Sequence, residues 1–201
     1  MLPNQCLSQE ILSFYHADYR SGDGSYKIDG TLENLIWTIK NDELKYDKDV
    51  LNQKGNDLAK ILKTDLPTIL GNLGYSELTI CIVPRSKVKY EETQLYFKKA
   101  VSWVAINLPG FIDGTSYITR HTNTKTTHLL YSRVPDLDKP PKKGITKDTC
   151  TLSDEIKGKN ILLIDDVYTK SINIDEDAIQ ALLDKGAESV VFYSIANTLP
   201  K

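Results

Sequence analysis

The sequence predicts an α/β protein with a mainly parallel central sheet flanked by helices. In the last third of the chain, an apolar run at 159–165 is followed by a polar segment, an amphipathic stretch at 174–186 and a second apolar run at 188–196. Strand, loop, helix and strand in this order form a βαβ unit, whose strands are parallel. A further run rich in β-branched residues, 78–84, ends at Pro84 and indicates another buried strand.

The composition sets limits on the class of protein. The 201 residues suit one domain, which at this size needs no disulfide or metal to form a core. A net charge of -2 does not indicate a nucleic-acid partner, and three widely spaced cysteines without a C-x-x-C pair argue against a zinc ribbon or redox motif. No run approaches the roughly 20 apolar residues that span a membrane. We therefore expect a cytoplasmic protein that does not act at a membrane.

Two helices are predicted in the first third of the chain. Residues 31–42 place apolar side chains at i, i+3, i+4 and i+7, and Thr31 is a suitable N-cap. Residues 52–73 carry a second such stripe, which Pro67 is expected to kink or break. Before them, residues 1–30 are mixed, with a turn at 21–25. We expect residues 1–75 to form a helical N-terminal hood and residues 76–201 to form the core, together making one structural domain.

The middle of the chain predicts a helix at 91–108, a turn at 109–114 and a strand at 115–119. From His121 to Lys147 the sequence is polar and contains several prolines, which predicts a long, mobile loop. Loops of this length inside a compact domain are often functional.

Two adjacent acids, Asp165 and Asp166, end the strand predicted at 159–165. Ligands of open parallel sheets bind beyond the carboxyl ends of the strands, and the N–H groups of a helix N-terminus suit phosphate. A carboxylate pair at that place is able to hold sugar hydroxyls or the water shell of Mg²⁺. Acids at a strand end also serve as plain turn caps, so the pair by itself leaves both interpretations open.

The stretch ILLIDDVYTKSINIDEDAIQALLDKGAESVVFYSIANT, residues 161–198, resembles the region of type I phosphoribosyltransferases that binds 5-phosphoribosyl 1-pyrophosphate (PRPP). The family pattern is an apolar strand, D-D-x-x-T-T-G-x-T, a helix ending at Gly, and a further strand. Asp165, Asp166, Thr169 and Gly186 match it. The ComF-like group of amidophosphoribosyltransferase relatives is the most similar branch. The resemblance implies a type I phosphoribosyltransferase fold and transfer of the phosphoribosyl group of PRPP to an acceptor, with release of pyrophosphate.

The resemblance also implies roles for single residues. Asp165 and Asp166 would be the catalytic acids that hold the ribose hydroxyls and the cofactor Mg²⁺, directly or through water. The loop around the 5′-phosphate would consist of Thr169, Lys170, Ser171, Ile172 and Asn173. The residues facing the pyrophosphate would be Arg85, Ser86 and Lys87 after the strand at 78–84, and Arg120 and Lys125 at the start of a loop that closes over PRPP.

The acceptor is not indicated by the sequence. Residues 1–75 contain aromatic side chains that either stack on an acceptor ring or are ordinary half-buried aromatics. They are Tyr15, Tyr19, Tyr26 and Trp37.

The phosphate loop departs from the family pattern, because Lys170 and Ser171 replace Thr and Gly and Asn173 replaces the last Thr. Lys adds a favourable charge and Asn is able to cap the helix, whereas three acids at 175–177 crowd its first turn. Two hypotheses follow: an active phosphoribosyltransferase, or a non-catalytic sensor of PRPP or nucleotides on the same fold. A receiver-like module fits less well, because its acid pair lies near the first strand. A homodimer, or a vestigial pocket in a larger complex, is left open.

Overall fold

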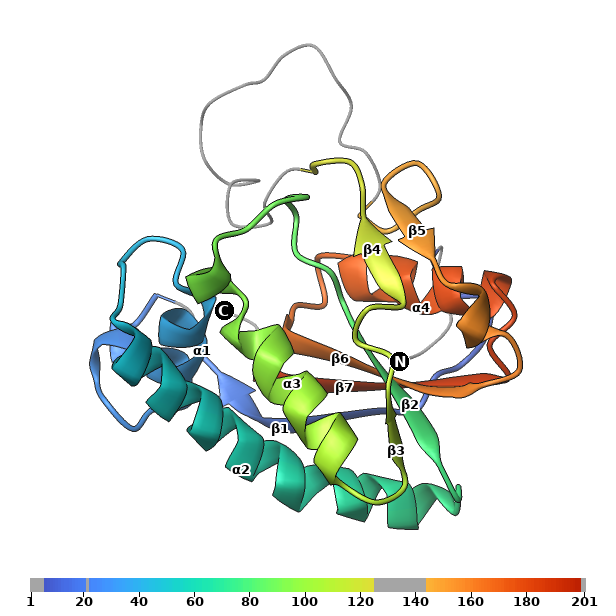
Figure 1. Ribbon diagram of the computed structural model, residues 1–201, viewed down its shortest axis with the longest axis horizontal. Coiled ribbons are helices and arrows are strands. Elements are labelled where there is room, and N and C mark those ends of the chain that lie inside the picture. The colour runs from blue at the N-terminus through green and yellow to red at the C-terminus, as the bar shows by residue number, and fades with distance from the viewer. Residues whose placement is uncertain (1–5, 21, 125–143, 200–201) are drawn as a thin grey trace.

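The computed structural model describes residues 6–20, 22–124 and 144–199. Five parallel strands form the central sheet in the order β1-β7-β6-β2-β3 (Figure 1). The strands are β1 (Ser13–Tyr19), β2 (Leu78–Ile82), β3 (Phe111–Asp113), β6 (Asn160–Tyr168) and β7 (Ser189–Thr198). The prediction of an α/β protein with a mainly parallel sheet is confirmed.

Helices cover both faces of this sheet. One face carries α1 (Leu32–Lys40), α2 (Lys48–Leu73) and α3 (Tyr96–Asn107). The other carries α4 (Ile174–Asp184) and an antiparallel pair, β4 (Ile118–Arg120) and β5 (Cys150–Leu152) (Figure 1). Within the described ranges, no helix has the length and apolar content needed to cross a bilayer.

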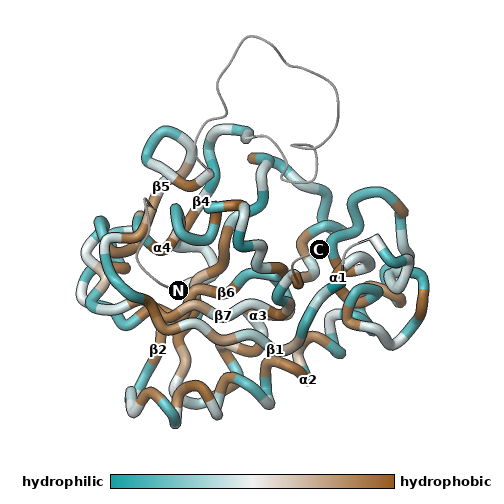
Figure 2. The backbone as a smooth tube through the Cα atoms, turned by 180° about the vertical axis from the view of Figure 1, so that it is seen from behind, coloured by the Kyte–Doolittle hydropathy of each residue, from teal (hydrophilic) through white to brown (hydrophobic). Residues whose placement is uncertain are grey.

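A hydrophobic core lies on each face of the sheet, and the side chains of β6 alternate between these two cores. Leu162 and Ile164 pack toward α1–α3, whereas Ile161 and Leu163 pack toward α4. Hydrophobic residues lie along the strands in Figure 2, while α2 alternates between hydrophobic and hydrophilic residues as a helix covering one face should.

The helices largely follow the sequence prediction. Thr31 caps α1, because its side chain accepts a hydrogen bond from the backbone N–H of Asn34 at 3.1 Å. The break considered at Pro67 does not occur, since α2 runs through it to Leu73. Leu62 and Leu66, both 0% exposed, anchor this part of α2 on the sheet, and their burial outweighs the one backbone hydrogen bond that Pro67 removes.

Four strands differ from expectation. β3 forms inside the turn predicted at 109–114, where it pairs with β2. β1 was not predicted, because this edge strand contains only exposed and half-buried residues and so lacks an apolar pattern. It still pairs with β7, so residues 1–75 contribute a strand as well as helices. β5 follows the loop predicted at 121–147, in a stretch for which no element was predicted. β6 continues to Tyr168 through pairing with β7, so the loop expected at 166–173 begins later. Most of the loop predicted at 121–147 lies outside the described residues.

The chain order creates a switch point in the sheet. β2 leads through α3 to β3 on one side, whereas β6 leads through α4 to β7 on the other. The two strands are direct neighbours at their carboxyl ends, where the N–H of Val83 donates to the carbonyl of Ile164 at 3.0 Å. Ligand sites of open α/β sheets lie in the crevice at such a point.

Candidate functional site

Asp165 and Asp166 lie within β6 beside this switch point, and their side chains point to opposite faces of the sheet, as those of successive strand residues do. The carboxyl group of Asp165 hydrogen-bonds that of Asp175, at the start of α4. On the other face, Oδ1 of Asp166 lies 2.9 Å from Nζ of Lys40, the last residue of α1. The two acids therefore have different partners and different chemistry.

The Asp165–Asp175 pair shares a proton. Burial, together with the charge of Asp166, raises the pKa of Asp165 to about 7. Burial and the charge of Asp165 raise the pKa of Asp175 well above its usual range. Two carboxyl groups in contact cannot both ionise readily, so near neutral pH one of them carries the proton of their hydrogen bond.

The acids of the first turn of α4 are held by the protein. Asp175 and Glu176 are only 1% and 2% exposed. Oε1 of Glu176 accepts a hydrogen bond from the Tyr168 hydroxyl at 3.0 Å, and Oδ2 of Asp177 accepts one from the N–H of Gly144 at 3.0 Å. The helix dipole favours carboxylates at this place, but burial outweighs it for Asp175 and Glu176 and raises the pKa of both.

The segment expected to hold a 5′-phosphate is a solvent-exposed turn. A hydrogen bond from the N–H of Ile172 to the carbonyl of Thr169, at 2.9 Å, closes this turn. Lys170, Ser171 and Asn173 are exposed, and no contact within the described residues uses the N–H groups of Lys170 or Ser171. These two N–H groups are therefore available to an anion.

The replacement of Gly by Ser171 causes no backbone strain. Among the described residues, Asn41 is the one non-glycine residue with a positive φ, so Ser171 has an ordinary backbone conformation. Asn173 precedes α4, but its side chain makes no capping hydrogen bond, contrary to our expectation.

Arg85, expected to face pyrophosphate, is bound by the protein itself. Its Nη1 donates to the carbonyls of Lys40 at 3.1 Å and Gln94 at 2.8 Å, and its Nη2 forms an ion pair with Asp42. The guanidinium lies 4.3 Å from the centroid of the Tyr90 ring. Arg85 thus fastens the end of α1 to the segment after β2.

Arg120 has a similar internal role. It is only 5% exposed, and its guanidinium donates to the backbone carbonyls of Pro84, Arg85 and Gly144. It joins the segment after β2 to the chain around Gly144, near the end of the loop predicted at 121–147.

The other residues assigned to pyrophosphate differ in exposure. Ser86 is buried, and its carbonyl accepts a hydrogen bond from the N–H of Thr124 at 2.8 Å. Lys87 is exposed, as is Lys170, and neither forms an ion pair within the described residues. Lys125 lies outside the described residues. The accessible cations at this edge therefore include Lys87 and Lys170.

Lys40 is the functional candidate that sequence reasoning missed. It ends a helix far from the acid pair in sequence, and no motif surrounds it. Its only sequence signal is a cation in the last turn of a helix, where it commonly serves the helix dipole.

The donor set does not fit a Mg²⁺ ion held directly by Asp165 and Asp166. Asp165 is hydrogen-bonded to Asp175, and the ammonium group of Lys40 lies against Asp166. Across the described parts of the chain, no group of three or more His, Cys, Asp or Glu side chains is arranged to hold a metal ion.

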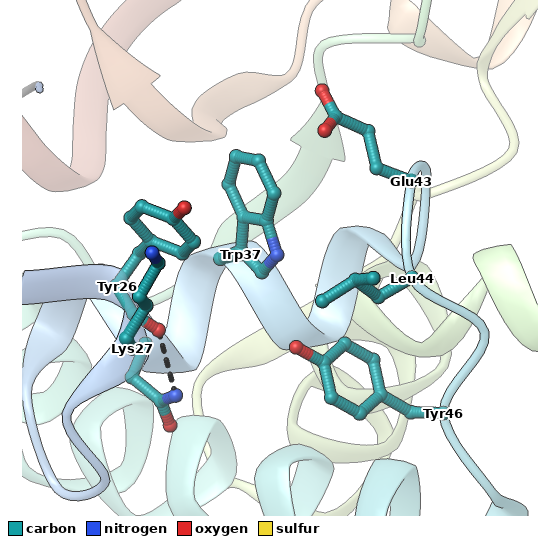
Figure 3. A pocket seen from close by; sticks show the side chains of 7 residues that line it. Tyr26, Lys27, Trp37, Glu43, Leu44 and Tyr46 are labelled. Atoms are coloured by element: carbon teal, nitrogen blue, oxygen red, sulfur yellow. Dashed lines mark hydrogen bonds between the residues drawn. The ribbon is translucent and has the colours of Figure 1, made fainter. Parts of the chain in front are cut away.

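An aromatic pocket lies along α1. It has a volume of about 490 Å³ and is lined by Tyr26, Lys27, Asn34, Trp37, Glu43, Leu44 and Tyr46. Tyr26 and Trp37 lie side by side in Figure 3, with ring centroids 4.4 Å apart, and Leu44 and Tyr46 form the opposite side. Trp37 is three residues before Lys40, so both lie on neighbouring positions of one helix face.

Asn34 provides a polar group at this pocket. Its Nδ2 donates to the carbonyl of Tyr26 at 2.9 Å, whereas its buried Oδ1 has no hydrogen-bond partner among the described residues. Buried acceptors are rarely left unpaired, so Oδ1 is suited to a donor from a ligand or water. Of the other aromatics considered for an acceptor, Tyr15 is 53% exposed on the edge strand β1, and Tyr19 is half-buried near Lys40.

Comparisons with known proteins add no family assignment: a scan against protein-family models finds no match, and a search of curated proteins finds none either.

Proposed function

We propose that this protein binds PRPP at the switch point between β2 and β6 and transfers its phosphoribosyl group to an acceptor, releasing pyrophosphate. One observation carries the proposal: the two acids lie near the carboxyl end of the central strand β6 at the switch point, shortly before an exposed turn and the N-terminus of α4. Acids for ribose hydroxyls and N–H groups for the attached phosphate are then adjacent in the chain.

Each part of the site has a distinct task in this proposal. Asp165, which shares a proton with Asp175, accepts hydrogen bonds from ribose hydroxyls and stabilises positive charge that develops on the ring. The N–H groups of Lys170 and Ser171, with the Lys170 ammonium, hold the 5′-phosphate. Lys87 approaches the leaving pyrophosphate from the segment after β2. The pocket at Trp37 is the candidate place for a planar acceptor.

A second candidate is a non-catalytic sensor that binds PRPP or a nucleotide at the same place. It is favoured by the engagement of Arg85 and Arg120, whose guanidinium groups are bound to backbone carbonyls. Fewer cations are then available to stabilise a departing pyrophosphate, although binding through the turn at 169–172 is unaffected.

Calorimetric titration with PRPP tests the site. Wild type and Asp184→Asn, an exposed change at the far end of α4, should bind alike, whereas Asp165→Asn should bind at least about tenfold more weakly. Equal affinity in all three proteins would place the ligand elsewhere, and absence of PRPP binding to wild type would refute the transferase and a sensor of PRPP.

Pyrophosphate release separates the two functions. Wild type is incubated with PRPP and a panel of purine and pyrimidine bases and amines, and pyrophosphate is measured with a coupled phosphate assay. Acceptor-dependent release that Asp165→Asn abolishes supports the transferase. Binding without release from any acceptor supports the sensor.

A further inference from the structure

We infer that the ammonium group of Lys40 is the resident cation of this site, so that PRPP binds to the protein without a divalent metal ion. The inference rests on the proposed function, because it concerns the same ligand. It also departs from what the family resemblance implies, since Mg²⁺ was the expected cofactor.

The Lys40–Asp166 pair differs from the other ion pairs of the protein. Its side chains are 20% and 15% exposed, and among the ion pairs of the described residues no other has both side chains at or below 20%. Enclosed pairs contribute little net stability, because desolvation offsets their attraction. A role for Lys40 at the switch point explains its position better than stability does.

The backbone holds Lys40 in place. The next residue, Asn41, has a left-handed conformation with φ 50°, and its Oδ1 accepts a hydrogen bond from the N–H of Tyr46 at 2.9 Å. Arg85 donates to the carbonyl of Lys40 itself at 3.1 Å. The end of α1 is thus tied to the segment after β2, and Arg85 is a positioning residue for Lys40.

Lys40 is charged at neutral pH. Burial alone would lower its pKa, but the carboxylates of Asp166 and Asp165 outweigh burial and raise it. Of its three N–H donors, contacts within the described residues use the one directed at Asp166, which leaves two for the oxygens of a phosphate or pyrophosphate.

A divalent ion would compete with this ammonium group for the same carboxylate. Mg²⁺ binds carboxylate oxygen at about 2.0–2.1 Å and requires an octahedral set of oxygen ligands. The ammonium nitrogen already lies 2.9 Å from Asp166 Oδ1, and the neighbouring Asp165 is bound to Asp175. Repulsion from Lys40 and the lack of free carboxylates both disfavour a metal at this position.

The test is a titration of wild type with PRPP in EDTA and again in excess MgCl₂. We expect the two affinities of wild type to agree within about threefold. Lys40→Met should bind at least about tenfold more weakly in EDTA, and MgCl₂ should restore part of the affinity, because Asp166 is then free to hold a cation. In Lys40→Met combined with Asp166→Asn, MgCl₂ should restore nothing.

Lys60→Met is the matched control, because Lys60 is an exposed lysine in an ion pair with Asp57 on α2. It should behave as wild type in both buffers. Circular dichroism establishes that each variant is folded, and the comparison of the two buffers in wild type needs no variant.

The outcomes separate the inference from the proposed function. Wild-type binding that disappears in EDTA overturns the inference and leaves the PRPP site standing. Unchanged affinity of Lys40→Met in EDTA overturns the role of Lys40. No binding of wild type in either buffer overturns the proposed function itself.

Discussion

The shared proton of Asp165 and Asp175 predicts a pH-dependent stability that needs no ligand to observe. Burial raises the pKa of Asp165 from 3.8 to about 7, so between these pH values the folded protein binds a proton that the unfolded chain has lost. The free energy of unfolding therefore falls as pH rises through this window. For one group, this difference in pKa corresponds to about 4 kcal/mol.

Asp165→Asn should remove most of that dependence. The amide is neutral at every pH, and its carbonyl oxygen is able to accept a hydrogen bond from the protonated Asp175 carboxyl, as the Asp165 carboxylate does. Relative to wild type, the variant should gain stability as pH rises from 4 to 8, by up to about 4 kcal/mol.

Urea unfolding, followed by circular dichroism, measures this difference at half-unit steps from pH 4.5 to 8. This pH range covers most of the window in which the Asp165 carboxyl titrates. Asp184→Asn, at the exposed end of α4, should follow the wild-type profile. An Asp165→Asn profile parallel to that of wild type would refute the reasoning, because the carboxyl pair would then hold no extra proton in the folded state.

Three further changes test other parts of the structure. Arg120→Met should lower the free energy of unfolding by about 3 kcal/mol, because three backbone carbonyls lose a charged donor; the exposed Lys87→Met should leave the urea midpoint unchanged. Thr31→Ala should lower the free energy of unfolding by about 1 kcal/mol through loss of the α1 N-cap, and an unchanged urea midpoint would contradict that role. Ser171→Gly should change the calorimetric affinity for PRPP by less than about twofold, since Ser171 already has an ordinary φ; a large gain would indicate a strained loop.

The regular elements were predictable where one physical signal dominates. In α1, the apolar spacing and the Thr31 cap agree, and the helix begins where they indicate. In the βαβ unit, two apolar strands and an amphipathic helix leave little choice of arrangement. β1 escaped prediction because it lies at the sheet edge, where its pairing with β7 depends on a partner distant in sequence.

The candidate site was predictable only as a position. Asp165 and Asp166 follow an apolar strand, and their place at the carboxyl edge of a parallel sheet follows from that pattern. In sequence, Arg85 and Arg120 look like free cations for a pyrophosphate. The backbone carbonyls that surround them come from other segments, so their engagement was not visible in the sequence.

By itself, the sequence determined the α/β class, the central βαβ unit and the placement of two acids beside an open turn, because these depend on local periodicity and on neighbours in the chain. Only the tertiary structure decided what those acids contact. Strand alternation turns Asp165 toward Asp175 and Asp166 toward Lys40, and the packing of α1 brings that lysine to the switch point. Charge pairing depends on distance in space, and the fold alone sets that distance for groups far apart in the chain.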